Sequence, residues 1–245
     1  MIDSLTSLRF LVITLIYFHH LSYSFGFGPA GVTFFFVLSG FVIGYVYNLK
    51  FISLVVEQVK LFYVKRLIKL YPLHIFTFLI AILLLYLPYS KPLVATNIFY
   101  TLCNFFLLQS YFPNGNQIFA FNALAWFLSD IVLFYLVTPF ILFFLHKFQI
   151  AKNLKFLLLL SLLLFFVEIA LALLFSNKIA SYTFGWWFIY ISPYFRVFDY
   201  GIGLVFGLVF VSIKDLLTHP HSLINKVVFS VLEITSIILF GFSFY

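Results

Sequence analysis

Two residues near the start of the chain, Arg9 and His20, could act together in chemistry. They are eleven residues apart. In a helix this spacing is three turns plus about 20°, so both lie on one face, about 16 Å apart along the axis. An imidazole buried among apolar side chains stays neutral, so His20 can act as a general base. The structural alternative is a core His bonded to a backbone carbonyl.

A second group of residues carries three positive charges just before Tyr71-Pro72: Lys65, Arg66 and Lys69. On a helix these three are i,i+3 and i,i+4 neighbours. Such a cluster can clamp a phosphate, and Arg adds bidentate contacts. The alternative is a polybasic segment beside the membrane that sets topology and touches anionic lipid.

Ionisable residues also occur inside long apolar stretches: Asp130, Glu168, Arg196, Asp199 and Glu233. Such groups are costly in a membrane and usually face a bundle interior or a wet cavity. Pairing with one another inside the bundle is the structural alternative. The single cysteine, Cys103, makes a cysteine-built metal site improbable, and we expect no bound metal.

The composition shows which elements must position these residues. Of the 245 residues, 64% are hydrophobic and 9% are charged. Soluble domains are about 45–50% apolar and about 25% charged. A water-soluble globule and a disordered chain are therefore excluded. We predict an all-α fold, a polytopic bundle of transmembrane helices.

A transmembrane helix needs about 20 apolar residues. The chain offers seven such stretches, at 8–25, 31–49, 71–90, 124–146, 154–176, 185–212 and 226–245. The sixth contains Pro193 and Arg196, which predicts a broken helix or two short pieces. Segment 97–110 is apolar but short, and we predict a re-entrant or interfacial segment there.

The charges indicate the orientation of these spans. With the N-terminus in the cytoplasm, eleven of the 14 Lys and Arg residues fall on the cytoplasmic side, and only Lys91 and Lys178 fall outside. This is a strong positive-inside bias. It also explains the net charge of +7 without a nucleic-acid partner. We expect one membrane domain over 1–245, with the first span retained rather than cleaved.

Six short motifs follow one another along the chain. The first three are Leu8-Arg9 with His20, then Gly31-Val32, Phe34-Phe35 and Ser39-Gly40-Phe41, then Arg66 and Lys69 before Tyr71-Pro72. The others are Asn104 to Gln109, then Trp126 with Phe134-Tyr135 and Pro139, then Arg196, Asp199 and Gly203. In this order they resemble the acyltransferase-3 family of integral membrane acyltransferases, which includes O-antigen and exopolysaccharide O-acetylases.

Three features depart from the family pattern. Lys69 replaces an Arg, which keeps the charge but loses the planar fork. Ile131 stands where the family usually carries a Glu, and the neighbouring Asp130 lies on a face turned by about 100°. The family typically has about ten spans, whereas about seven are predicted here. We therefore expect a domain incomplete at its C-terminus; a short variant and an inactive copy stay open.

The resemblance implies a function. Acyltransferases of this family move an acyl group, commonly acetyl, from cytoplasmic acyl-CoA to a hydroxyl of an extracytoplasmic glycan or lipid-linked sugar. The expected partners are thus acyl-CoA as donor substrate, a glycan acceptor and membrane lipids, with no bound cofactor. The expected location is the inner membrane of a bacterium.

The resemblance also suggests residue roles. His20 would be the general base, or would carry the acyl group in a covalent relay. Arg9 would hold donor phosphate or orient the site. The expected donor-binding residues are Arg66, Lys69 and Lys65, and the residues expected to line or support the cavity are Ser39, Trp126, Asp130, Arg196 and Asp199. The alternatives are a small glycan or lipid transporter, whose path would use the same residues, and an inactive scaffold.

Overall fold

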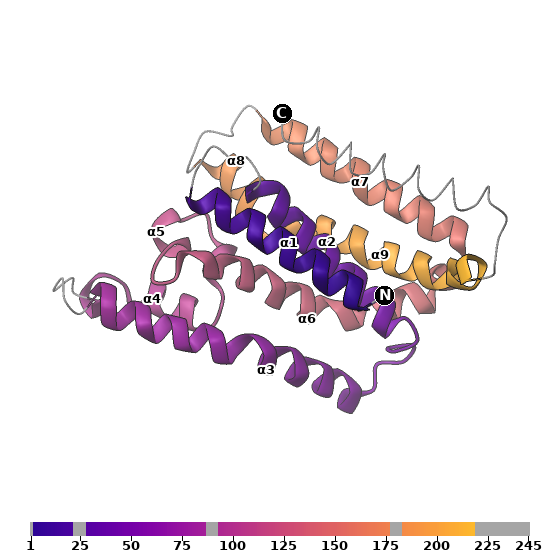
Figure 1. Cartoon of the computed structure of the whole chain (residues 1–245), viewed down its shortest axis with the longest axis horizontal. Helices are drawn as coiled ribbons and strands as arrows, with labels where there is room; N and C mark the ends of the chain where they lie inside the picture. Colours follow the sequence, from indigo (N-terminus) through magenta and orange to yellow (C-terminus); the bar gives the residue numbers. More distant parts are fainter. Residues whose placement is uncertain (1, 22–27, 87–92, 177–182, 219–245) are drawn as a thin grey trace.

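The computed structural model describes residues 2–21, 28–86, 93–176 and 183–218. Throughout these ranges the regular structure is helical, without a strand. Five helical stretches are long and apolar enough to cross a membrane: Gly28–Tyr47, Val56–Leu84, Ala123–Lys147, Leu154–Phe175 and Phe184–Ile213. The predicted polytopic helix bundle is therefore confirmed (Figure 1).

The two outermost predicted spans differ from these five. Helix α1 covers Ile2–Leu21, and its apolar part, Arg9–Leu21, is shorter than the other candidate spans. The predicted span 226–245 lies outside the described residues. Helix α4 (Leu93–Phe105) has 13 residues, which is too short to cross a bilayer, as expected for the 97–110 region.

Helices α2 (Gly28–Tyr47) and α9 (Pro193–Thr218) pack closely at the centre of the bundle. Glycines on both helices allow this approach. A Cβ atom at Gly40 would collide with the backbone oxygen of Tyr200, and one at Gly203 with that of Val37. Helix α2 continues through Ser39 and Gly40 without a break. Small residues let two backbones approach closely, as is common in membranes.

The predicted break in the sixth span is confirmed. Helix α8 (Phe184–Trp186) runs into a π-helical turn, η5 (Trp187–Ile191), and Ser192 is extended, with ψ 127°. Pro193 then starts α9. Proline disfavours a helical conformation in the residue before it and suits the first position of a helix. The break places Arg196 in the first turn of α9.

Helix α3 (Val56–Ala81) begins earlier than predicted and continues through Pro72. Lys65, Arg66 and Lys69 therefore lie within this helix and not ahead of a new one. A proline removes only one backbone donor, and helices in membranes tolerate this loss. With 26 residues, α3 is about 39 Å long, which exceeds the hydrocarbon core of about 30 Å.

Short elements connect the long helices. Three of them lead from α4 into α6 (Trp126–Lys147): the 3₁₀ turn η2 (Gln109–Tyr111), α5 (Gly115–Ile118) and the 3₁₀ turn η3 (Ala123–Ala125). The 3₁₀ turn η4 (Ile150–Lys152) joins α6 to α7 (Leu154–Ser176). The π-helical turn η1 (Ile82–Tyr86) follows α3.

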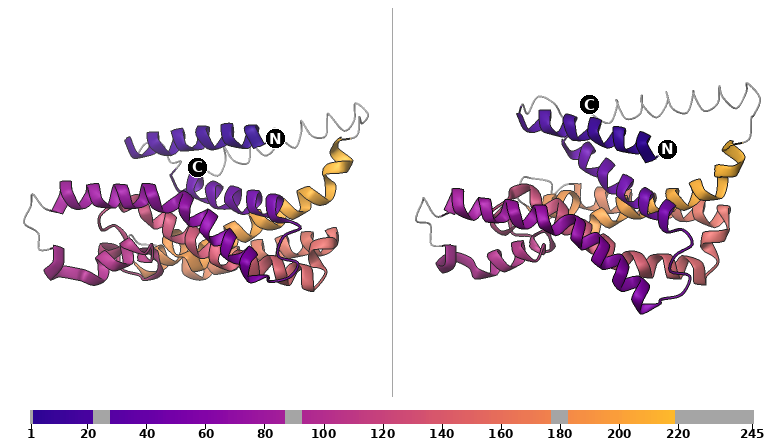
Figure 2. Two further views of the ribbon diagram at one scale, coloured as in Figure 1. Left: turned by 90° about the horizontal axis from the view of Figure 1, so that it is seen from below. Right: turned by 60° about the horizontal axis from the view of Figure 1, so that its bottom comes forward.

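The basic connections gather at one end of the bundle. The ends of α2 and α6 meet there: His146, near the end of α6, donates a hydrogen bond to the carbonyl oxygen of Asn48, just after α2, over 2.6 Å. The starts of α3 and α7 lie at the same end, on the right of Figure 1. Figure 2 shows the same grouping from two other directions. This end carries Lys50, Lys147, Lys152 and Lys155. That it faces the cytoplasm stays a prediction.

Candidate functional site

The structure brings His20 and Trp126 to one cavity of about 300 Å³, here called the His20 cavity. Helices α1, α2 and α6 and the turns η3 and η5 form it. Its walls are mostly aromatic and aliphatic, and they include Phe35, Phe127 and Tyr190. An apolar cavity with a single imidazole can hold an acyl group beside a base.

The hydrogen bond of His20 defines which ring nitrogen is free. Nδ1 lies 2.8 Å from the carbonyl oxygen of Ile16. A carbonyl oxygen only accepts, so Nδ1 carries the hydrogen and Nε2 of the neutral ring keeps a lone pair. The His20 side chain is exposed rather than buried by protein, contrary to expectation. His20 therefore has both expected features: its Nδ1 is hydrogen-bonded to a backbone carbonyl, and its Nε2 is left as a basic nitrogen.

Arg196 stands behind the wall of the His20 cavity. Its Nε donates to the carbonyl oxygen of Tyr190 over 2.9 Å, and its guanidinium lies 5.5 Å from the centre of the Tyr190 ring. Tyr190 in turn packs against Trp126, with ring centres 5.5 Å apart. Arg196 therefore fixes an aromatic wall and does not itself line the cavity.

Arg196 also organises a polar network between α2, α7 and α9. Its Nη1 donates to Asp199 Oδ2 and to Thr33 Oγ1, each over 3.0 Å. Glu168 of α7 lies near Asp199, so the two carboxyl groups influence each other electrostatically. Arg196 and Asp199 form the single ion pair within the described ranges.

Asp130 does not line the His20 cavity. It is fully buried near Ser110 of η2, and its carboxyl oxygens have no hydrogen-bond partner in the described part of the chain. The Ser110 hydroxyl donates to Ser129 Oγ over 2.7 Å, and Ser129 donates to the carbonyl oxygen of Leu107. The neighbouring Ile131, at the position of the family Glu, is buried in the apolar core.

Arg66 is held in an aromatic cage. Its guanidinium carbon lies 5.1 Å from the ring centre of Tyr47 and 5.4 Å from those of Phe62 and Tyr135. Such cation–π contacts stabilise a cation where water is scarce. Arg66 therefore contacts aromatic rings of α2, α3 and α6.

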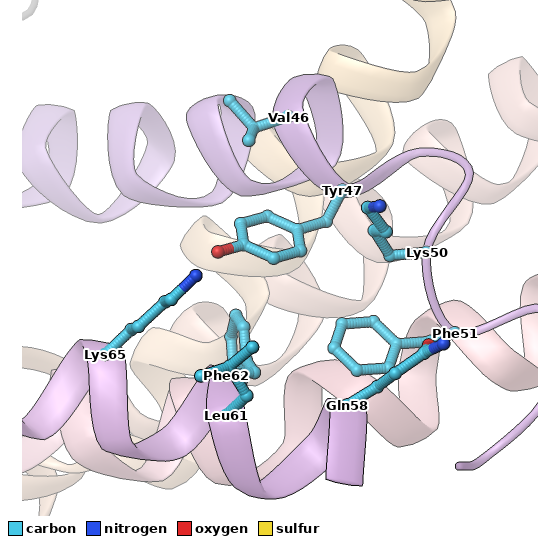
Figure 3. A pocket seen from close by; sticks show the side chains of 8 residues that line it. All are labelled: Val46, Tyr47, Lys50, Phe51, Gln58, Leu61, Phe62 and Lys65. Atoms are coloured by element: carbon cyan, nitrogen blue, oxygen red, sulfur yellow. The ribbon is translucent and has the colours of Figure 1, made fainter.

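A second cavity, of about 320 Å³, lies between the end of α2 and the start of α3 (Figure 3). It is called the Lys50 pocket here, and Tyr47, Lys50, Gln58, Phe62 and Lys65 are among its walls. Of the three predicted donor cations, only Lys65 lines it. Arg66 lies behind Tyr47, and Lys69 is exposed on α3.

Ser39 is the remaining predicted cavity residue. It is half-buried on α2 and lines neither of these two cavities. Four residues that line these cavities or surround Arg66 were absent from the predicted set: Tyr47, Lys50, Tyr135 and Tyr190. Tyr135 belongs to a motif that the sequence displays, which was the one available signal for it.

Fold and sites together define a helical membrane protein with one aromatic, base-bearing cavity and one basic pocket. A family model described as an acyltransferase domain matches residues 2–245. The chain therefore belongs to the acyltransferase-3 family.

Among curated proteins, the chain is similar to acyltransferase MdmB of Streptomyces mycarofaciens. The two are 34% identical over 113 residues, which cover 46% of this chain and 28% of that protein. The chain thus matches well under two thirds of this relative. No solved structure matches the chain.

Proposed function

We propose that the chain transfers an acyl group, most simply acetyl, from acyl-CoA to a hydroxyl of an extracytoplasmic or lipid-linked glycan. The observation that carries the proposal is His20 Nε2, a free basic nitrogen at an aromatic cavity of about 300 Å³. Membership of the acyltransferase-3 family supports the reaction class. The proposed location is a bacterial inner membrane, with the N-terminus in the cytoplasm.

In the proposed reaction, His20 Nε2 takes the proton of the acceptor hydroxyl. The oxygen then bonds to the thioester carbonyl carbon, and the carbon–sulfur bond breaks. The leaving thiolate receives the proton, so an ester and free CoA are formed without any other reactant. In the relay variant, His20 Nε2 bonds to the acyl carbon while the carbon–sulfur bond breaks and CoA leaves as a thiolate. The acceptor oxygen then bonds to that carbon, the nitrogen–carbon bond breaks, and the hydroxyl proton goes to the thiolate.

The donor is proposed to enter from the basic end of the bundle. Lys65, Arg66 and Arg9 lie toward this end, and Lys69 is one turn further along α3. The predicted topology makes this end cytoplasmic, where acyl-CoA is available. Arg9 and His20 are about 16 Å apart along α1, so an extended CoA arm would run along this helix. The acceptor would approach from the opposite end.

The test measures labelled acetyl transfer from acetyl-CoA to an extracted host glycan, in membranes with matched amounts of each protein. General-base catalysis contributes about 10²–10⁴-fold, so His20→Ala should lose at least about 10²-fold in rate. His19→Asn is the control, because it removes the neighbouring imidazole on a different face of α1. Near-normal transfer by His20→Ala contradicts the assignment. An acyl label that remains on the chain after rapid quenching would favour the covalent relay over direct general-base catalysis.

A further inference from the structure

The Lys50 pocket combines two ammonium groups with one aromatic hydroxyl. Lys50 and Lys65 line the pocket from opposite sides, and the Tyr47 ring lies between them (Figure 3). Among the described residues, no carboxylate contributes to its walls. Like charges at one small cavity repel, and an anion between them relieves this repulsion.

A third positive charge lies directly behind the pocket. The guanidinium of Arg66 is stacked 5.1 Å from the ring centre of Tyr47, the same ring that forms a pocket wall. One Arg66 atom, Nε, is buried without a hydrogen-bond partner. The surrounding potential is therefore positive on both sides of this wall, which favours a multiply charged anion.

The turn that carries Lys50 is fixed by its neighbours. Lys50 N donates to the carbonyl oxygen of Tyr47 over 2.9 Å. Phe51 then adopts a left-handed conformation, with φ 59°, and is buried to 3% exposure. Its ring packs against Phe62, with centres 5.4 Å apart. Non-glycine residues adopt such a conformation only when the surroundings impose it, and functional sites are common places for it.

We propose that the Lys50 pocket binds a phosphate group of the acyl donor, with Lys50 and Lys65 as its charged ligands. The inference rests on the proposed function and adds Lys50, which belongs to none of the six motifs. Anionic lipid headgroups carry the same phosphate chemistry. The donor is favoured because Arg66 continues the row of cations inward to the Tyr135 ring. A headgroup held at the membrane surface would not need that row.

The experiment measures binding of tritiated acetyl-CoA to the full chain in nanodiscs of zwitterionic lipid. Lys50→Gln and Lys65→Gln should each weaken binding about tenfold, the loss of one charge-assisted hydrogen bond. Lys60→Gln is the matched control, since Lys60 is exposed on the same helix and lines a different groove. Its affinity should stay within twofold of the wild type. Pantetheine, which has no nucleotide phosphates, serves as competitor beside CoA.

The competition separates a lost phosphate contact from general damage. In the wild type, CoA should compete much better than pantetheine. This advantage should shrink about tenfold in Lys50→Gln, while pantetheine competes as before. Unchanged acetyl-CoA binding by Lys50→Gln, or an equal loss in Lys60→Gln, overturns the proposal.

A second arm tests the lipid source. Nanodiscs with phosphatidylglycerol should leave the effect of Lys50→Gln on acetyl-CoA binding in place. If Lys50→Gln instead removes only a thermal stabilisation by phosphatidylglycerol, the pocket holds a headgroup and the proposal fails. Binding that depends on Lys50 without any acyl transfer refutes the proposed function alone. If Lys50→Gln transfers acetyl with the wild-type KM for acetyl-CoA, only the assignment of the Lys50 pocket is refuted. If folded wild-type protein binds no acetyl-CoA, both proposals are refuted.

Discussion

Individual side chains decide which chemistry this bundle can perform. The 11-residue spacing of Arg9 and His20 was visible in the sequence, because helix geometry relates them directly. The free nitrogen of His20 was not, since it depends on the bond to Ile16. The pocket of Lys50 and the position of Glu168 beside Asp199 were not visible either, because both depend on how the helices pack against one another. A single sequence gives no register for such contacts.

The carboxyl pair of Glu168 and Asp199 gives a prediction at the residue scale. Glu168→Gln keeps a polar side chain able to donate a hydrogen bond beside the buried Asp199, whereas Glu168→Ala removes it. The alanine variant should lose about 1–3 kcal/mol of stability, and the glutamine variant much less. Thermal unfolding in detergent measures both. Equal losses in the two variants would show that a polar side chain at position 168 contributes nothing to stability.

Among the helices, apolar length and proline position were informative in the sequence. They predicted the five long helices and the break at Pro193. They misplaced the start of α3, because a proline marks only one missing hydrogen bond and here the helix continues through it. The close packing of α2 against α9 at their glycines came from the structure.

Two glycines of α9 provide a matched pair for testing helix packing. A Cβ at Gly203 would collide with the backbone of Val37, whereas one at Gly201 would meet only Leu164 Cδ1, at an ordinary 3.5 Å. Gly203→Ala should therefore cost roughly 1–3 kcal/mol of stability through overpacking. Gly201→Ala should be neutral or stabilising by up to about 1 kcal/mol, because alanine favours the helix. Melting temperatures that fall equally in both variants contradict the packing described.

Across the whole molecule, charge distribution and motif order carried the most information. The basic connections lie together at one end of the bundle, as the positive-inside pattern requires (Figure 1). The ordered motifs indicated the family, and the match over residues 2–245 confirms it. The acceptor has no such signature, because no residue pattern in this chain specifies a particular sugar.

Orientation can be tested on the whole molecule by cysteine labelling. In a Cys103→Ser background, Lys152→Cys should react with a membrane-impermeant maleimide only after the cells are permeabilised. Lys178→Cys, predicted from the sequence to lie outside, should react in intact cells. The physical reason is the cytoplasmic excess of Lys and Arg. Labelling at 152 in intact cells would reverse the assigned orientation and move the basic pocket away from cytoplasmic acyl-CoA.

The most direct test of His20 is single-turnover acetyl transfer by reconstituted protein preloaded with labelled acetyl-CoA. Binding and chemistry are then measured in one sample. We expect His20→Ala to bind the donor like the wild type and to transfer acetyl to the glycan at least about 10²-fold more slowly. Transfer by His20→Ala at the wild-type rate would contradict a catalytic role for His20.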